Sequence, residues 1–391
     1  MAIGWATSTL AAWAAVLAAV VVVVPVGWLA RRRAGRAEPG PGAASRGPRL
    51  GLADAVLAAV LAGVVVLVQL VVAVRAGASS WQLMAVVFDD VAIALPLVGA
   101  AVVVSHVASR RWATPSATGP VLVLAGVALL AAPVGWYVVH VAPFDLRLET
   151  VAQPLPPERA GDDTIRIGVL SDIQTTNIGA HERAAARLVA DQQPDLVVVA
   201  GDLFQGSPAQ LDANREALRS LLVDLDAPSG VFVVEGDVDG PNDLPGLVEG
   251  TGATLLRDEI VTIAVGDRTV RLAGMRLEPH PRSDGVIDAV AARPPEEVGI
   301  VLAHRPDWAL RAPPGSVDLV IAGHTHGGQI QLPFLGPLTV ASRVPRSVGA
   351  GGLHQVDGNP LYVTPGVGRE QQGAPQIRFL ADPSVAIIEL G

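Results

Sequence analysis

The stretch Leu170-Ser-Asp-Ile-Gln174 ends the apolar run 165–169 with a carboxylate and an amide. Similar short β-branched runs alternate with stretches of helical period through the rest of the chain. This alternation predicts an α/β fold. The predicted strands are about 165–170, 196–200, 231–234, 254–263, 269–275, 298–303, 318–322 and 385–390, and the predicted helices are 180–191 and 208–225.

Polar side chains follow the predicted strands at the points where the strands stop. They stand at Asp172 and Gln174, Gly201-Asp202, Gly236-Asp237-Val238-Asp239, His304, and Gly323-His324-Thr325-His326-Gly327-Gly328-Gln329. In an open α/β sheet, ligands bind at the carboxyl ends of the strands, so we expect these loops to converge on one site. Carboxylates, imidazoles and amides without thiolates form a ligand set suited to Mn, Fe or Zn.

The order of these motifs resembles the calcineurin-like metallophosphoesterase superfamily, whose usual pattern is Asp-x-His, Gly-Asp, Gly-Asn-His-Asp or Glu, His, and Gly-His-x-His. The resemblance covers residues 164–391. His304-Arg-Pro-Asp307 and Gly327-Gly328-Gln329 are most similar to the bacterial membrane-anchored branch. The resemblance implies a four-layer α/β/β/α sandwich that hydrolyses phosphoesters with two divalent metal ions.

Carried over by position, the resemblance implies two ligand sets that share one carboxylate. The first metal would be held by Asp172, Gln174, Asp202 and His326, and the second by Asp202, Asp237, His304 and His324. Asp202, His324 and His326 are the implied catalytic residues. A hydroxide on the metals would attack phosphorus. Mn is the favoured metal, with Fe, Zn and Mg as alternatives.

Three residues depart from the family pattern. Gln174 replaces a His and offers a harder oxygen donor, which favours Mn or Mg over Zn. Asp237 replaces an Asn and adds a charge. Val238 replaces a His that helps the leaving group depart, and losing such a group costs on the order of 10²- to 10⁴-fold in rate. The residues that could replace that His in space are His181, Asn177 and Asp239, and the sequence does not decide among them.

The front of the chain is apolar and predicts a membrane region. Half of all residues are hydrophobic (50%). Residues 1–145 contain four apolar runs, about 5–29, 52–74, 91–108 and 120–141, each long enough to cross a bilayer core of about 30 Å. Residues 146–163 are expected to be a linker to the phosphoesterase domain, 164–391.

Charge divides the chain in the same way. The first 150 residues hold ten Arg and six acids, and the remainder eighteen Arg and thirty-one acids. The acidic second part argues against nucleic acid as a partner. Basic loops stay in the cytoplasm, so Arg31-Arg-Arg33 and Arg110-Arg111 place both chain ends and the phosphoesterase domain on the extracytoplasmic face.

The predicted function is hydrolysis of a phosphodiester or of a phosphate linked to a lipid or the envelope, with membrane lipids as neighbours. The alternative, motivated by Val238, is a catalytically weak membrane sensor that binds metal or phosphate. A transporter regulated by the outer domain is a third reading, but the spans lack the charged or broken helices expected of a pathway. The oligomeric state is left open.

Overall fold

The computed structural model describes residues 66–110, 119–240, 244–371 and 373–391. The chain divides into two compact units. The first contains Met1–Tyr137 and Gln372–Pro375, and the second contains Val138–Gln371 and Gln376–Gly391.

Apolar helices make up most of the described part of the first unit. A short helix, Val66–Arg75, precedes α3 (Ser80–Asp89), the π-helical turn η1 (Asp90–Ala94), α4 (Leu95–Arg110) and α5 (Gly119–His140). Ser79 and Gln82 form a capping box that starts α3. Two windows, Trp81–Val104 and Val121–Phe144, are apolar and 24 residues long, which is enough by length and composition to cross a membrane.

The two long helical segments approach each other closely at glycines. A Cβ on Gly99 would lie 2.7 Å from the carbonyl oxygen of Ala125, and one on Gly135 would lie 2.7 Å from the Cβ of Ala92. Small residues at a helix contact are typical of membrane helices, where backbones pack directly on one another.

The described helices coincide with two of the predicted apolar runs, 91–108 and 120–141. The run predicted at 91–108 lies inside a longer helix that begins at Ser80. Asp89 and Asp90 lie within that helix, just before the predicted run, and Asp90 is buried. The predicted span 5–29 lies outside the described residues, and the span 52–74 is described only from residue 66. A four-helix membrane region therefore stays a prediction.

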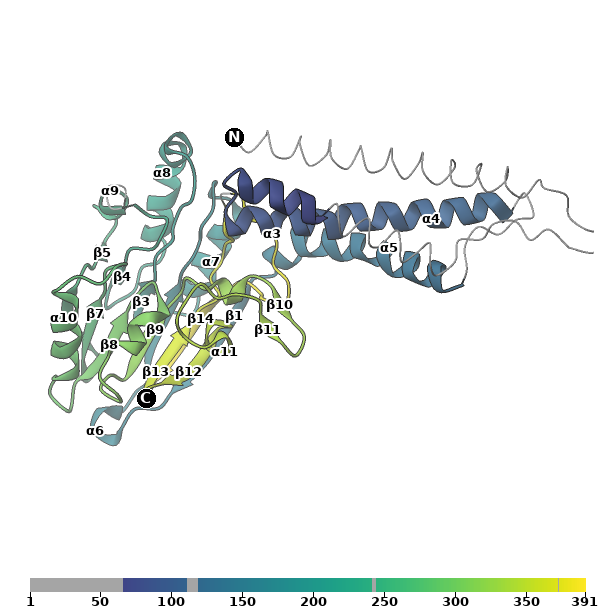
Figure 1. The fold of residues 1–391 in the computed structure, drawn as a ribbon. Helices are drawn as coiled ribbons and strands as arrows, with labels where there is room; N and C mark the ends of the chain where they lie inside the picture. The colour runs from purple at the N-terminus through teal and green to yellow at the C-terminus, as the bar shows by residue number, and fades with distance from the viewer. Residues whose placement is uncertain (1–65, 111–118, 241–243, 372) are drawn as a thin grey trace, which may run out of the picture. The chain divides into compact units, whose positions relative to one another are not determined.

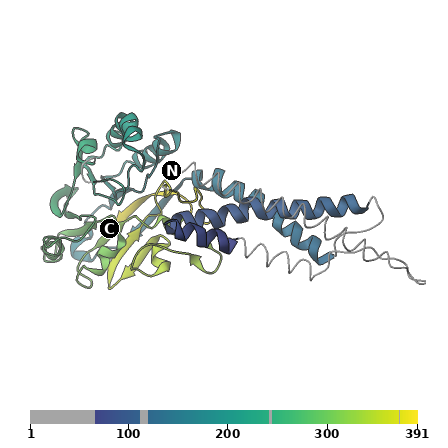
Figure 2. The same ribbon diagram turned by 45° about the horizontal axis from the view of Figure 1, so that its top comes forward.

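The second unit contains two six-stranded sheets (Figure 1; Figure 2). The first sheet has the order β1 (Arg147–Gln153), β14 (Ser384–Leu390), β2 (Ile165–Leu170), β3 (Leu196–Val199), β4 (Val231–Val233) and β5 (Ala253–Leu255). The second has the order β12 (Gly352–Val356), β13 (Asn359–Val363), β9 (Leu319–Ala322), β8 (Val298–Leu302), β7 (Arg268–Gly274) and β6 (Glu259–Val265). A short hairpin, β10 (Gln331–Leu332) with β11 (Gly336–Pro337), follows β9.

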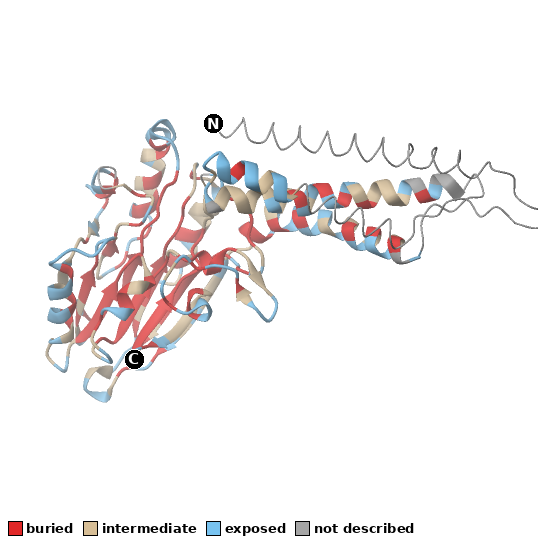
Figure 3. Ribbon diagram, viewed as in Figure 1, coloured by how far each residue is buried: buried red, intermediate tan, exposed pale blue. Residues whose placement is uncertain are grey.

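The two sheets enclose one apolar core and carry helices on their outer faces. Residues of both sheets, such as Ile167 and Ile300, meet in the core between them. The first sheet is covered by α7 (Ala180–Ala190), α8 (Pro208–Val223) and α9 (Leu244–Val248), and the second by α10 (Ser283–Ala291), η3 (Pro306–Leu310) and α11 (Arg346–Gly349). The central strands β2, β3, β8 and β9 are accordingly mostly red in Figure 3, whereas the edge strands are partly tan or pale blue. This is the α/β/β/α sandwich that the resemblance implies.

The predicted linker 146–163 is wrong as a linker, because it carries a strand. β1 pairs in parallel with β14 over seven residue pairs, Arg147↔Ser384 to Gln153↔Leu390. The short helix α6 (Pro157–Ala160) follows it. The sandwich therefore begins only a few residues after α5 ends. The composition of the segment is polar because β1 is an edge strand, exposed along part of its length.

The predicted strand 254–263 is two strands, β5 and β6, that belong to different sheets. The chain turns between them at Asp258, whose φ is 55°. The Asp258 carboxylate fixes this turn by accepting a hydrogen bond from Ser283 Oγ at 2.8 Å. A run of β-branched residues alone does not reveal such a turn. The hairpin β12–β13 is also not among the predicted strands, because glycines at 351, 352 and 358 interrupt the apolar pattern of its sequence.

Candidate metal centre

The residues predicted at the strand ends lie at the carboxyl ends of β2, β3, β4, β8 and β9. Five of them take left-handed backbone conformations: Asp172, Gln174, Asp202, His324 and His326 have φ between 36° and 72°. Such backbone angles are costly for residues other than glycine, and they gather at functional sites. Turns of this kind bend the chain sharply after each strand, so that the side chains face one another.

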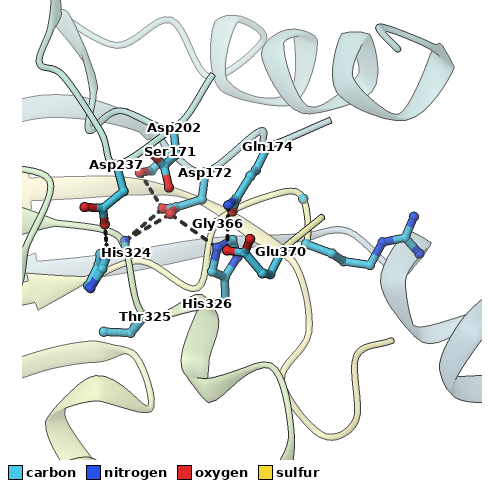
Figure 4. Close-up of polar contacts among 12 residues, drawn as sticks. Ser171, Asp172, Gln174, Asp202, Asp237, His324, Thr325, His326, Gly366 and Glu370 are labelled. Carbon is cyan, nitrogen blue, oxygen red and sulfur yellow. Dashed lines mark hydrogen bonds and ion pairs between the residues drawn. The ribbon is translucent and has the colours of Figure 1, made fainter. Parts of the chain in front are cut away.

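The first cluster consists of Asp172, Asp202 and His326. One ligand atom from each lies within 4.8 Å of the other two, and all three residues are buried. His326 Nε2 is 3.7 Å from Asp172 Oδ1 (Figure 4). Gln174 is joined to this cluster, because its backbone N–H donates to the Asp202 carbonyl at 2.9 Å and its side chain is only 1% exposed.

The second cluster consists of Asp237, His304 and His324 and satisfies the same 4.8 Å criterion. His324 Nδ1 lies 2.5 Å from Asp237 Oδ2. His304 Nε2 lies 3.3 Å from Asp202 Oδ2 and 3.4 Å from Asp237 Oδ2, so Asp202 stands between the two clusters.

The histidines of the second cluster are oriented by carbonyl groups behind them. His304 Nδ1 contacts the Ala200 carbonyl at 2.7 Å, and His324 Nε2 contacts the Ala341 carbonyl at 2.9 Å. Each ring therefore donates its N–H away from the cluster and presents its other nitrogen to it. This arrangement fixes the tautomer and orientation of metal-binding histidines.

Three buried polar atoms at the clusters have no hydrogen-bond partner: Gln174 Oε1, His304 Nε2 and His326 Nδ1. Leaving a buried acceptor unpaired costs about 1–3 kcal/mol. Amide oxygen and imidazole nitrogen are ligands for divalent cations, and the neighbouring carboxylates supply opposite charge. The residues therefore fit two divalent cations, the first at the Asp172 cluster and the second at the Asp237 cluster.

Comparison with known proteins agrees with this geometry. The profile of the calcineurin-like phosphoesterase family matches residues 165–328. The metallophosphoesterase YkuE of Bacillus subtilis is 28% identical over 250 residues, which are 62% of this chain and 83% of that one. Phosphodiesterase YaeI of Escherichia coli is 30% identical over 222 residues, which are 53% of this chain and 74% of that one. The chain belongs to the calcineurin-like phosphoesterase family.

Among solved structures, a dimetal phosphatase from Danio rerio aligns with 53% of this chain and 88% of its own, at 15% identity and a TM-score of 0.32. The assignment to the phosphoesterase family rests on the sequence comparisons.

Gln174, where the phosphoesterase family has His, is oriented by a residue that sequence reasoning missed. Its Nε2 donates to Glu370 Oε2 at 3.0 Å, which turns its oxygen toward the first cluster (Figure 4). The other oxygen of Glu370 accepts from Gln205 Nε2 at 2.6 Å, and the Glu370 backbone N–H donates to Gln329 Oε1 at 3.0 Å. Gln329, a candidate for lining the site, thus holds the backbone of Glu370.

Two arginines at the phosphoesterase site were also missed. Arg305 forms ion pairs with Asp237 and with Glu278, so its guanidinium balances the charge that Asp237 adds. Because Arg305 directly follows the predicted ligand His304, its sequence position alone could have indicated that it lies near the site. Arg378 is 1% exposed and donates to the carbonyls of Pro365 and Gly368 at 2.8 and 2.6 Å. Arg378 thereby holds the turn in which the Gly368 N–H donates to the Asp172 carbonyl. The sequence around Arg378 contains no motif that would have predicted this role.

Val238, which replaces the family's His, is partly buried at the rim of the site. Its backbone N–H donates to Asp202 Oδ1 at 2.9 Å. The three residues considered as replacements are engaged elsewhere or exposed. Asp239 accepts from the N–H groups of Asp202, Leu203 and Gly236, His181 Nε2 contacts the Val367 carbonyl at 3.3 Å, and Asn177 is exposed.

Without metal, the clusters hold protons that a cation must displace. Burial raises the pKa of Asp172 to about 6. Burial alone would lower the pKa of His304, but the carboxylates of Asp202 and Asp237 outweigh it and raise that pKa well above its usual value. Burial, reinforced by Arg378, lowers the pKa of His326 to about 3, so this ring is neutral and ready to coordinate.

We therefore expect metal binding to release protons and to strengthen as pH rises. Cations bind the unprotonated forms of Asp172 and His304, so affinity falls as pH drops through the pKa of Asp172, about 6. Titration calorimetry with Mn²⁺ at pH 7, in buffers of different ionisation enthalpy, should report proton release. An enthalpy that does not depend on the buffer would contradict this expectation.

Removal of the Glu370 carboxylate should weaken the first metal position. In Glu370→Ala the Gln174 amide is free to turn its nitrogen toward the cluster. Loss of such an orienting contact typically lowers metal affinity about 10- to 100-fold. Calorimetry should show one of two Mn²⁺ sites weakened and the other unchanged. Glu216→Ala on α8 is the matched control. Equal weakening of both sites would mean that Glu370 supports the fold rather than Gln174.

Proposed function

We propose that this protein is a membrane-anchored, dinuclear metal-dependent phosphoesterase whose catalytic domain lies on the extracytoplasmic face. The observation that supports the activity most directly is the pair of ligand clusters on either side of Asp202, with three buried nitrogen and oxygen atoms that make no hydrogen bond. When bound, two divalent cations supply the oxygen nucleophile and neutralise charge on the phosphoryl group.

The chain's own residues would hold and position these cations. Asp172, Gln174, Asp202 and His326 would bind the first, and Asp202, Asp237, His304 and His324 the second. The three carboxylates oppose two divalent charges, which leaves about one positive charge to attract an anionic ester. Arg305 stands beside Asp237 and adds a cation at the rim of the site.

Membrane anchoring is proposed from the apolar helices. The windows Trp81–Val104 and Val121–Phe144 are long enough to span, and α4 and α5 expose large apolar side chains. Val104 and Val123 are each 66% exposed, and Leu130 is 63% exposed, as suits contact with lipid. Arg110 at the end of α4 and the next residue in the sequence, Arg111, favour a cytoplasmic position for this stretch, which supports an extracytoplasmic domain after α5.

The proposed substrate is a phosphodiester or a phosphate linked to a lipid or the envelope. YaeI, a relative of this chain, is named a phosphodiesterase. The proposed position beside the outer leaflet supports a substrate carried by the membrane or the envelope.

Metal removal and reloading tests the activity. The full-length protein in detergent is stripped with chelator and reloaded with Mn, Fe, Zn or Mg, and turnover of an aryl phosphodiester and an aryl phosphomonoester is measured. We expect turnover only after loading and fastest with Mn²⁺, because Gln174 supplies an oxygen donor. Turnover that survives complete metal removal would refute the proposal.

A sensor is the second candidate, because Val238 cannot protonate a leaving group. It predicts that two metal ions bind and that turnover nevertheless stays at the level of the stripped protein. Metal content measured on the same samples as turnover therefore separates the two functions.

A further inference from the structure

The β10–β11 hairpin exposes a cluster of large apolar side chains. Phe334 is 107% exposed and Leu335 66% exposed at its tip, Leu338 is 48% exposed beside it, and Leu380 is 55% exposed on the adjoining segment. A cluster of exposed apolar side chains on one loop marks a site of interaction with another protein or with a membrane.

Hydrogen bonds connect this hairpin to the end of α5. The Arg378 N–H donates to the Val138 carbonyl at 3.0 Å, and the next residue, Phe379, donates to the Gln329 carbonyl at 3.0 Å. The Gln331 N–H in turn donates to the Phe379 carbonyl at 2.8 Å. Val138 lies in the last turn of α5, so the base of the hairpin is hydrogen-bonded to the end of that apolar helix.

The charges around the hairpin suit an anionic surface. The chain after residue 150 holds thirty-one acids, yet residues 319–356 contain none. The same stretch contains Arg343 and Arg346, both exposed, and Arg346 Nη1 donates to the carbonyl of Pro337 at 3.3 Å. Apolar residues flanked by arginine are a combination that inserts into the boundary between lipid headgroups and acyl chains.

One end of this segment contacts a residue that orients a proposed metal ligand, and the other end contacts a proposed ligand itself. Gln329, immediately before the hairpin, accepts a hydrogen bond from the backbone of Glu370, which orients Gln174. Ala341, shortly after it, accepts from Nε2 of His324. The hairpin therefore lies in the segment that connects Gln329, near the first cluster, with Ala341, at the second cluster.

We propose that the β10–β11 hairpin inserts its tip into the lipid interface and that the substrate is a phosphoester borne by a membrane lipid. Insertion at Phe334 and Leu335 brings lipid headgroups to the edge of the metal centre. The substrate half of this proposal rests on the proposed phosphoesterase function, and the insertion half does not. A bilayer is the occupant rather than a protein, because the base of the hairpin is hydrogen-bonded to the last turn of the apolar helix α5 and the exposed Arg343 and Arg346 follow the hairpin in the chain.

Single-site labelling tests the insertion. The chain has no Cys, so Leu335→Cys carries one label, an environment-sensitive nitrobenzoxadiazole. The full chain is reconstituted into vesicles of phosphatidylcholine and phosphatidylglycerol. We expect a blue-shifted emission that spin-labelled lipids quench. Val223→Cys, at a 52% exposed apolar position on α8, is the matched control and should stay unquenched. An unquenched label at position 335 would overturn the proposal and would favour a protein as the partner of this apolar cluster.

A pair of esters tests the substrate class. Hexadecyl and ethyl p-nitrophenyl phosphate share a leaving group and differ in the chain that anchors one of them in the vesicle. In Phe334→Asp with Leu335→Asp we expect KM for the hexadecyl ester to rise roughly tenfold, with the ethyl ester unchanged. An equal change for both esters, or none, would refute lipid delivery. Failure of wild type to cleave either ester, with the label still quenched, would refute the phosphoesterase and the lipid-borne substrate, while insertion would stand.

Discussion

Asp202→Ala should abolish both metal binding and phosphodiester turnover. Asp202 is 2% exposed and stands between the two clusters, with Oδ2 3.3 Å from His304 Nε2 and with one carboxylate oxygen within 4.8 Å of the ligand atoms of Asp172 and His326. Its removal takes a ligand from both proposed cations at once. We expect kcat/KM to fall roughly 10³-fold or more. Mn²⁺ binding measured by calorimetry should fall at both sites.

A matched aspartate separates this effect from a loss of charge. Asp212→Ala on α8 removes an exposed carboxylate that pairs only loosely with Arg215, at 3.4 Å. It should leave metal content and turnover unchanged. Circular dichroism of both variants checks the fold, because Asp202 also accepts a hydrogen bond from the Val238 N–H. Two metal ions and wild-type turnover in Asp202→Ala would remove Asp202 from the proposed site.

Val238→His should accelerate turnover. Val238 lies next to Asp237 in the second cluster, and its backbone is fixed by the Asp202 carboxylate. An imidazole there would protonate the leaving oxygen, a contribution worth about 10²-fold or more in general acid catalysis. We expect kcat for an alkyl phosphodiester to rise about 10²-fold and to decline above the pKa of the new imidazole, about 6.5 when unperturbed.

The pH profile distinguishes proton donation from a change of shape. Val238→Asn introduces a polar side chain that does not titrate, and it should give neither the increase nor the new limb in the profile. An aryl ester, whose leaving group needs little protonation, should gain much less than the alkyl ester. If the His and Asn variants behave alike, Val238 is not the position from which a proton reaches the leaving group.

The sequence located the loops of the site because their positions follow from strand periodicity. Asp172, Asp202, Asp237, His304 and His324 all follow runs that alternate with helices, and parallel strands bring their carboxyl ends to one edge. The structure brings these residues together as two clusters, and the identity of the ligands stays a prediction. The fold class followed from the same alternation.

The supporting residues could not be found in this way. Glu370 lies 196 positions from Gln174 in the chain, and Arg378 has no charged motif around it. Their roles depend on how a loop near the end of the chain folds back over β2, which no local pattern records. β1 was missed for a related reason, since an edge strand that is partly exposed lacks the apolar run of a buried one.

The pairing of β1 with β14 has a mechanical consequence. The strands run parallel, β1 begins just after α5, and β14 is the last strand of the sandwich. A force applied between the start of β1 and the end of β14 would act parallel to both strands. All seven residue pairs would then bear the load together and would not break one after another. An unfolding motor or protease that grips the chain at the end of β14 would meet its greatest resistance at the first step.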